Sequence, residues 1–468
     1  MNEASRTERA ACGALVTFYC LLHVVLYLWV VPKDAWREGG DLGTYLDPAI
    51  GLYRYGAFVQ PDDPATPSLY RLPLYTIVVA GGLAISGGES PRPTLVVNLI
   101  MLLGTGLLMR RVALAWIPRR ANLVLGLVLF NPLLVGTAYI LQPLNLNALW
   151  YALAAWLLLR DRSPPGPVDI LLVGVVAGLS ALTRPGGQVL IAALPVAIPI
   201  LACVMDRNAK ISKAFVAALC AAALGAITTA PWMIYAERAG HGYRLSSVEH
   251  NTLFLRDNNS SLEFYVRGGS LQDAKERVIA DIGVWRASQG EAYASLSPAE
   301  KSAATNEFLV RHFAIYPPTA FMQAWAMSVG NLVFGGGSAN LRIALGIEAP
   351  SAWVKVVLEG YNTLTAFLAI FSEMSLPAAM VSFASVGFVV LCRLLGIVGF
   401  VAAARRGDWP PLVVALGLGA YFAVIHVFVG ESIYRVPIES LLMLLAAYGA
   451  DAILGRRVPP GSTRGHGA

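Results

Sequence analysis

Residues 39–75 read GGDLGTYLDPAIGLYRYGAFVQPDDPATPSLYRLPLY, a polar stretch that lies between long hydrophobic runs. It carries four aspartates and five tyrosines, and Arg54 and Arg71 are its only cations. This density of acidic and aromatic side chains differs sharply from the apolar segments on either side. We therefore interpret this stretch as the functional loop around which the rest of the chain is organised.

The composition is that of a membrane protein with many spans. The 468 residues are 56% hydrophobic and only 14% charged, with a mean hydropathy of +0.60, which is too apolar for a soluble domain. The net charge of +6 comes from short basic clusters between apolar runs, a distribution that sets membrane orientation and does not indicate a nucleic-acid partner. All five cysteines lie inside apolar runs, so we expect no structural disulfide.

The apolar runs predict an all-α protein with about twelve transmembrane helices, since one span needs about 20 apolar residues. The first run is too long for a signal peptide and lacks a cleavage site, so we expect it to be retained. The run 72–85 is short and contains Gly81 and Gly82, so we expect it to lie in the interface or to re-enter the membrane. The predicted spans are residues 11–31, 94–110, 123–140, 144–159, 170–183, 189–204, 214–234, 319–334, 352–371, 379–403, 412–429 and 433–454.

The positive-inside rule gives these spans an orientation. With the N-terminus in the cytoplasm, the basic clusters between spans all fall on the cytoplasmic side. Two long loops, 32–93 and 235–318, then lie outside, and Ser297, Pro298 and Glu300 predict a helix start in the second loop. We expect one transmembrane domain over 1–458, a disordered cytoplasmic tail over 459–468, and a location in the inner (plasma) membrane with both termini cytoplasmic.

Asp41 is the residue of the first loop best suited to chemistry. A carboxylate beside the membrane can accept a proton from a hydroxyl, as a transferase requires. Asp41 also suits the N-cap of the helical segment that follows it, and on the sequence alone the two roles stand about even. Asp47 is an alternative base, whereas Asp62 and Asp63 are flanked by prolines and are typical of a turn.

Three arginines share the predicted outer face and each lies near a proline. Arg71, Arg184 and Arg435 together would suit an anionic phosphate at the membrane surface. Any one of them alone could equally extend toward lipid headgroups. The histidines show no metal-binding spacing, so we expect no metal site built by the protein; acidic residues could hold a divalent cation, but nothing indicates one.

At these residues the chain resembles the GT-C superfamily of glycosyltransferases that use polyprenyl-phosphate sugars, in particular the branch of protein O-mannosyltransferases and lipid A aminoarabinose transferases (glycosyltransferase family 39-like). The motifs occur in the family's order over most of the chain, and individually each is short. They are the acidic residue, Tyr and Gly-x-Phe of 41–58, the Arg-x-Pro-x-Tyr of 71–75, the Gly-Leu-x-x-Leu-Thr-Arg-Pro of 178–185, Pro231-Trp232, and the Tyr-Arg-x-Pro of 434–437.

The resemblance implies a GT-C-like fold and the transfer of one sugar, with inversion, from a polyprenyl-phosphate donor to a glycan, lipid or protein acceptor outside the cytoplasm. Asp41 would be the base, and no cofactor would be required. Arg71 and Arg435 would hold the donor phosphate, with Arg184 as a further candidate. The matching positions Tyr45 and Tyr75 would position the substrate.

The chain departs from the family in the external turn between the third and fourth predicted spans. Many relatives carry an acidic residue there, whereas this turn contains Gln142 and Asn145. These amides could position a sugar hydroxyl, and a mechanism with two carboxylates is placed in doubt. Two other readings remain: a lipid-linked sugar flippase or other transporter, and a non-catalytic subunit that binds polyprenyl lipid. Charges concentrated in external loops favour the transferase over the transporter.

Overall fold

A computed structural model describes residues 6–34, 36, 42–240, 242–245, 248–347, 374–425 and 432–455. Over these residues the chain is helical, and its extended pairing consists of one antiparallel bridge between Val59 and Pro67. The all-α prediction is confirmed. The main helices are α1 (Arg6–Val25), α2 (Leu42–Tyr55), α3 (Pro73–Ile85), α4 (Pro93–Trp116), α5 (Ala121–Leu129), α6 (Pro132–Ala138), α7 (Leu144–Leu159), α8 (Pro167–Thr183), α9 (Gly187–Met205), α10 (Ile211–Arg238), α11 (Val248–Arg267), α12 (Leu271–Ala294), α13 (Pro298–His312), α14 (Pro318–Phe334), α15 (Ser338–Ala344), α18 (Leu376–Arg406), α19 (Trp409–Ile425) and α20 (Val436–Leu454). Short helical turns are η1 (Leu26–Val30), η3 (Pro118–Arg120), η4 (Phe313–Ile315) and η5 (Ser432–Arg435).

Among the described residues, six helices are long and apolar enough to cross a membrane, and a bent pair would make a seventh. Other apolar helices, such as α7 and α8, are shorter. The predicted boundaries of residues 144–159 match α7, and most other predicted spans lie inside longer helices. The predicted span 352–371 lies outside the described residues, as do residues 426–429 of another. The count of twelve spans therefore stays a prediction.

The prediction of one continuous helix over 123–140 is wrong, because α5 and α6 form a pair bent by 49°. The break falls at Asn131, whose side-chain oxygen accepts hydrogen bonds from the backbone of Leu133 at 3.0 Å and Leu134 at 3.4 Å. Pro132 follows as the first residue of α6 and has no N–H to continue the preceding helix. An N-cap and a proline inside one apolar run thus create two helices.

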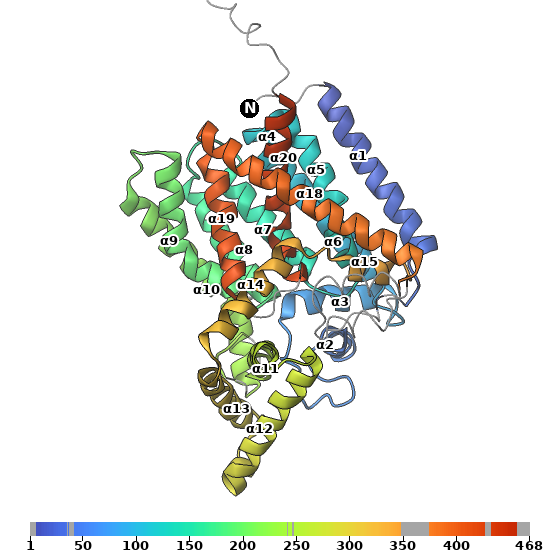
Figure 1. The fold of residues 1–468 in the computed structure, drawn as a ribbon, viewed down its shortest axis with the longest axis vertical. Helices are drawn as coiled ribbons and strands as arrows, with labels where there is room; N and C mark the ends of the chain where they lie inside the picture. The colour runs from blue at the N-terminus through green and yellow to red at the C-terminus, as the bar shows by residue number, and fades with distance from the viewer. Residues whose placement is uncertain are drawn as a thin grey trace, which may run out of the picture.

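Helix α3 lies across the end of the bundle rather than along it (Figure 1). It has 13 residues, too few to span, as predicted for an interfacial or re-entrant segment. Gly81 and Gly82 do not break it. A Cβ at Gly82 would lie 2.1 Å from Thr94 Oγ1, so glycine allows α3 to touch the start of α4.

Helices α18 and α20 are in backbone contact. A Cβ at Gly399 would lie 1.9 Å from the Leu445 carbonyl oxygen, and one at Gly449 would lie 1.9 Å from that of Leu395. Small residues at a helix interface allow this close approach in membrane proteins. Helix α20 is almost wholly buried and forms the centre of the bundle with α4, α5 and α7 (Figure 1).

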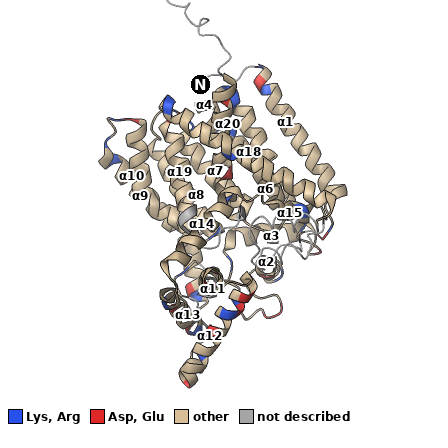
Figure 2. Ribbon diagram, viewed as in Figure 1, with Lys and Arg blue, Asp and Glu red and all other residues tan. Residues whose placement is uncertain are grey.

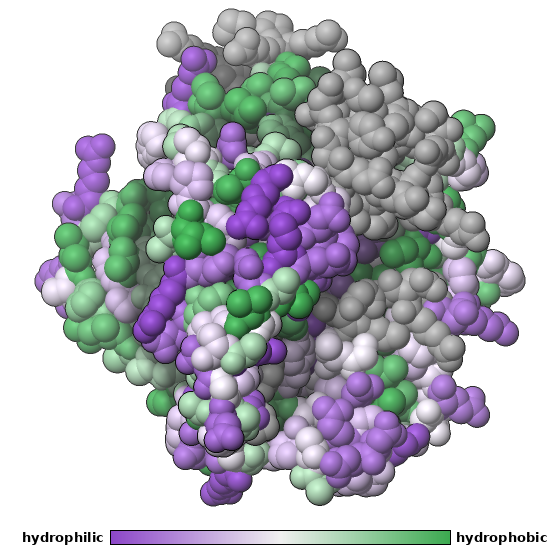
Figure 3. Space-filling view, turned by 60° about the horizontal axis from the view of Figure 1, so that its bottom comes forward, coloured by the Kyte–Doolittle hydropathy of each residue, from purple (hydrophilic) through white to green (hydrophobic). Residues whose placement is uncertain are grey.

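The predicted second external loop folds into α11, α12 and α13, which project from the same end of the bundle as α2 and α3 (Figures 1 and 2). The predicted helix start is confirmed as a capping box: the Ser297 side chain accepts from the Glu300 N–H, and the Ser297 N–H donates to Glu300 Oε2 at 2.9 Å. Polar side chains gather over this end of the molecule (Figure 3).

The described ends of the chain lie together at the opposite end of the bundle (Figure 1). Basic residues gather there, and several form ion pairs between segments distant in sequence, such as Arg162 with Asp408 at 3.2 Å and Arg406 with Asp451 at 2.9 Å (Figure 2). These ion pairs hold segments together at the end of the bundle where the described termini lie, and the orientation of that end in the membrane stays a prediction.

Candidate active site at the loop end of the bundle

Arg71 joins the two halves of the first loop. Its Nε donates to Thr44 Oγ1 at 2.7 Å, and its guanidinium carbon lies 4.6 Å from the ring centre of Tyr45 and 5.0 Å from that of Tyr70. The side chain is half-buried. Its contacts place a cation beside the first turn of α2, three residues from Asp41. Asp41 itself lies outside the described residues, so its role stays a prediction.

Tyr45 and Tyr75 form the floor beneath this arginine. Their rings meet edge to face with centres 5.4 Å apart, and both side chains are buried. The Tyr75 hydroxyl accepts from Asn98 Nδ2 at 3.1 Å, and the same amide nitrogen donates to the Ile140 carbonyl at 3.1 Å. Burial raises the pKa of Tyr75, so its hydroxyl stays protonated. The described contacts of Tyr75 support α3; direct substrate contact stays a prediction.

The turn between α6 and α7 packs against the same floor. Leu141 shares a hydrophobic cluster with Tyr45 and Tyr75. Gln142 is 8% exposed and Asn145 is fully buried, and within the described chain neither Gln142 Oε1 nor Asn145 Oδ1 has a hydrogen-bond partner. A buried acceptor without a donor costs about 1–3 kcal/mol. Both predicted positioning residues thus carry a buried acceptor without a partner in the described chain, and their contact with a substrate stays a prediction.

Asp47 lies one turn after Thr44 on α2 and is half-buried. Burial raises the pKa of its carboxyl above the ordinary value, and the negative charge of Asp62 raises it further. The turn prediction holds for Asp63, whose carboxylate accepts from the Ala65 N–H at 3.2 Å and the Thr66 hydroxyl at 2.5 Å. Asp47 therefore has the electrostatics of a base better matched to neutral pH than an ordinary aspartate.

Arg184 is the C-cap residue of α8, and its side chain contacts Tyr434 of the last sequence motif. Its guanidinium carbon lies 5.4 Å from the ring centre of Tyr434. The preceding residue, Thr183, accepts a hydrogen bond from Trp150 Nε1 at 3.1 Å. The Thr-Arg-Pro and Tyr-Arg-x-Pro motifs, which are 250 residues apart in numbering, are thus brought together as predicted from topology. The contact is made by Tyr434 and not by Arg435.

Arg435 is in a different environment from the other two arginines. It is 1% exposed, its Nε donates to Glu439 Oε2 at 2.7 Å, and its terminal nitrogens donate to the carbonyls of Leu332 at 2.7 Å and Gly335 at 2.6 Å. Every nitrogen of this guanidinium is engaged. Its role as a phosphate ligand stays a prediction that these contacts do not favour, because a phosphate would have to displace a carboxylate and two carbonyls.

Glu439 and Arg393 are charged residues that the motif analysis missed. Arg393 Nη2 lies 2.7 Å from Glu439 Oε2, and Asn131 Nδ2 donates to Glu439 Oε1 at 3.0 Å. The cluster therefore ties α6, α14, α18 and α20 together. The signal was available in the sequence, since each charge interrupts an otherwise apolar run and such residues pair or function. Among the described residues, no group of three His, Cys, Asp or Glu side chains could hold a metal ion.

No protein-family model matches the chain. No curated protein matches it in sequence. Among solved structures it is similar to the oligosaccharyltransferase AglB of Archaeoglobus fulgidus in complex with an inhibitory peptide and a dolichol-phosphate, with 14% identity, a TM-score of 0.49, and coverage of 97% of this chain and 51% of that one. A structure of the Archaeoglobus fulgidus oligosaccharyltransferase with Zn and sulfate gives 12% identity, a TM-score of 0.45, and 95% and 50% coverage.

ArnT from Cupriavidus metallidurans in the apo state gives 15% identity, a TM-score of 0.38, and coverage of 94% of this chain and 79% of that one. The chain spans about half the length of the oligosaccharyltransferase chains it matches. These likenesses are distant, and the candidate site rests on its own contacts.

Proposed function

We propose that the chain is an integral membrane glycosyltransferase of the GT-C type that moves one sugar from a polyprenyl-phosphate donor to a glycan, lipid or protein acceptor. One observation carries the proposal: motifs distant in sequence meet at the loop end of the bundle. Arg71 contacts the first turn of α2, the turn of Gln142 packs on the floor beneath it, and Arg184 contacts Tyr434. We assign the extracytoplasmic side to this end and the cytoplasmic side to the termini.

The donor phosphate would be held by Arg71 and Arg184. Both guanidiniums are half-buried and lie over tyrosine rings, which orients each cation. The departing polyprenyl phosphate keeps the electron pair of the broken bond, and cations that stabilise this developing charge contribute most of the catalysis. Arg435 is assigned to supporting Tyr434, its neighbour in the chain.

Asp41 would act as the base. The acceptor hydroxyl attacks the anomeric carbon from the side opposite the phosphate, its proton passes to the carboxylate, and the bond between the anomeric carbon and the phosphate oxygen breaks, so the configuration inverts. The contact of Arg71 with Thr44 supports this arrangement because it brings the start of α2 beside the phosphate-binding cation. Asp47 is the alternative base.

The buried amide oxygens of Gln142 and Asn145 would accept hydrogen bonds from sugar hydroxyls. Each lacks a donor in the described chain, so a bound hydroxyl would satisfy a group that is otherwise unpaired. No cofactor is invoked in this mechanism, and a divalent cation is neither required nor assigned ligands.

The test uses the purified chain with a panel of polyprenyl-phosphate sugars and cell-envelope acceptors. We expect sugar transfer by the wild type, loss of transfer by at least a hundredfold in Asp41→Asn, and retained donor binding. Asp63→Asn is the matched control, because it removes a charge from the same loop and asparagine can keep the turn. Equal transfer by Asp41→Asn and wild type would reject Asp41; loss in Asp47→Asn alone would move the role to Asp47.

Two outcomes would favour the other functions. Movement of lipid-linked sugar across a vesicle membrane without a transferred product would indicate a flippase. Donor binding without transfer or transport for any sugar of the panel would indicate a lipid-binding subunit.

A further inference from the structure

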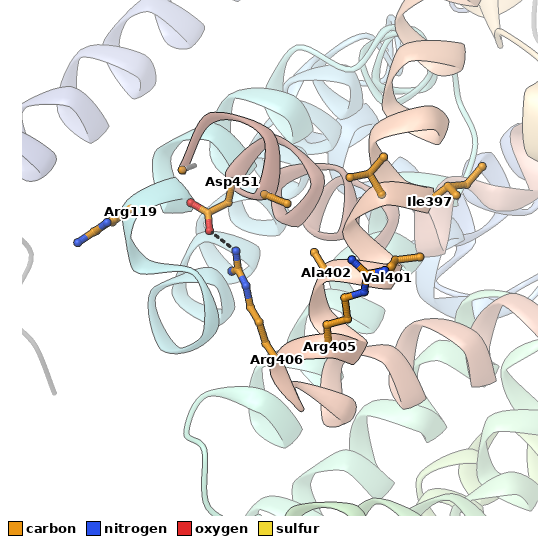
Figure 4. Close-up of a pocket in the computed structure, with 10 residues that line it drawn as sticks. Arg119, Ile397, Val401, Ala402, Arg405, Arg406 and Asp451 are labelled. Carbon is orange, nitrogen blue, oxygen red and sulfur yellow. Dashed lines mark ion pairs between the residues drawn. The ribbon is translucent and has the colours of Figure 1, made fainter. Parts of the chain in front are cut away.

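A groove lies at the end of the bundle where the described chain begins and finishes, which we call the termini end, opposite the candidate active site (Figure 1). It has a volume of about 630 Å³ and is formed by the last turns of α18 and α20 together with η3. Its lining combines arginines with aliphatic side chains (Figure 4). The candidate site does not use any of these residues.

The rim of the groove carries excess positive charge. Arg119, Arg405 and Arg406 line it, and the acidic residue among the lining residues is Asp451. Arg406 lies 2.9 Å from Asp451 (Figure 4). Asp451 also lies 3.3 Å from Arg120, which is outside the lining. In the described part of the chain neither Arg119 nor Arg405 forms an ion pair, and both are exposed. Two cations are therefore available to an anion at this rim.

The floor of the groove is apolar and open. Ile397, Val398 and Val401 line it and are 61%, 41% and 41% exposed. From Arg405 back to Ile397 the helix rises by about 12 Å, at 1.5 Å per residue. One leaflet contributes about 15 Å of hydrocarbon. The groove therefore runs from a cationic rim into the depth of one leaflet.

A second groove continues the apolar floor. Ile397 lines both, and the second groove, of about 280 Å³, adds aliphatic and aromatic side chains such as Phe400, Leu442 and Leu445. Arg393 also lines it, with its charge held by Glu439. The close contact of α18 with α20 at Gly399 and Gly449 makes the wall between these helices rigid.

We propose that this groove binds one anionic phospholipid of the leaflet at the termini end. The phosphate would lie at the rim that carries Arg119 and Arg405, and an acyl chain would follow Val401, Val398 and Ile397 toward the second groove. Charge complementarity selects an anionic headgroup, because a zwitterionic lipid brings its own cation to the rim. The apolar floor selects a lipid over a free phosphate.

The test is native mass spectrometry of the full chain in detergent with equal amounts of phosphatidylglycerol and phosphatidylcholine. We expect one phosphatidylglycerol to be retained in preference to phosphatidylcholine. Arg119→Gln/Arg405→Gln should weaken its binding about thirtyfold, since each arginine near a membrane surface contributes about 1 kcal/mol, or about fivefold. The control Arg207→Gln/Lys210→Gln removes the same charge from exposed positions between α9 and α10 and should retain the lipid.

A second set of measurements distinguishes binding of the whole phospholipid from binding of its headgroup alone. Val398→Trp fills the floor without changing charge and should weaken phosphatidylglycerol about tenfold, while glycerol phosphate should not displace the lipid. Equal retention of both phospholipids, or equal loss in the control, would overturn the proposal. So would displacement by glycerol phosphate at concentrations close to that of the lipid. Thermal unfolding of each variant checks that it is folded.

Discussion

The surroundings of Arg71 and Arg435 differ more than their similar sequence motifs suggest. Arg71 is half-buried, lies over two tyrosine rings and donates to a threonine hydroxyl. Arg435 is 1% exposed and donates to a glutamate and two backbone carbonyls. The tyrosine rings orient the Arg71 cation, whereas a buried carboxylate neutralises the charge of Arg435. An Arg-x-Pro motif at a helix start can therefore either bind a ligand or stabilise the fold, and its role depends on the groups that surround the guanidinium.

The largest effect is expected in the buried cluster. Glu439→Gln leaves Arg393 and Arg435 without their shared carboxylate inside the bundle, and we expect it to lower the free energy of unfolding by about 3–5 kcal/mol. Thermal or denaturant unfolding in detergent measures this. Adding Arg393→Gln restores the cluster's original net charge, so the double variant should be more stable than Glu439→Gln. Unchanged stability in Glu439→Gln would show that the buried carboxylate does not stabilise the fold through Arg435 and Arg393.

A smaller and opposite effect is expected at the loop end of the bundle. Gln142→Met keeps the volume of the side chain and removes an amide oxygen that has no partner in the described chain. We expect stability to be unchanged or higher, and sugar transfer to fall about tenfold, the equivalent of one lost hydrogen bond to substrate. Stability and transfer are measured on the same preparation. A stability loss with full transfer would show that Gln142 serves the fold.

The smallest effect concerns the titration of Asp47. Its folded-state pKa is raised above 3.8 by burial and by Asp62, so the native state binds this proton more tightly than the unfolded state. The native state is then penalised once pH exceeds the raised pKa, and the penalty disappears as pH falls below about 4. We expect Asp47→Asn to melt slightly higher than wild type at pH 7 and equally at pH 4. Asp63→Asn should show no such crossover.

Local patterns in the sequence predicted local structure well. The capping residues Ser297 and Glu300 and the bounds of α7 follow from side chains within one or two helical turns. The bend at Asn131 was missed because an apolar run hides a proline and its cap when only hydropathy is counted. The meeting of Arg184 with the last motif followed from topology, but the partner ring of Tyr434 depends on how α8 and η5 pack.

The site was less accessible to sequence reasoning than the fold. The burial of Gln142 and Asn145 arises from the packing of their turn on α2 and α3, which no spacing rule reports. Glu439 lies one helical turn after Arg435, so the ion pair could have been read from the sequence. Its second partner, Arg393, comes from another helix and required the three-dimensional structure.

The assignment of Arg71 to phosphate binding and of Arg435 to the fold is tested by measuring the binding of polyprenyl phosphate to Arg71→Gln, Arg435→Gln and wild type side by side. We expect Arg71→Gln to weaken binding at least tenfold with little change in stability, since a charged hydrogen bond contributes about 1.5–3 kcal/mol. We expect Arg435→Gln to be less stable, through loss of its bond to Glu439, and its folded fraction to bind the lipid phosphate as wild type does. Weakened binding in Arg435→Gln with full affinity in Arg71→Gln would show that Arg435, and not Arg71, holds the lipid phosphate.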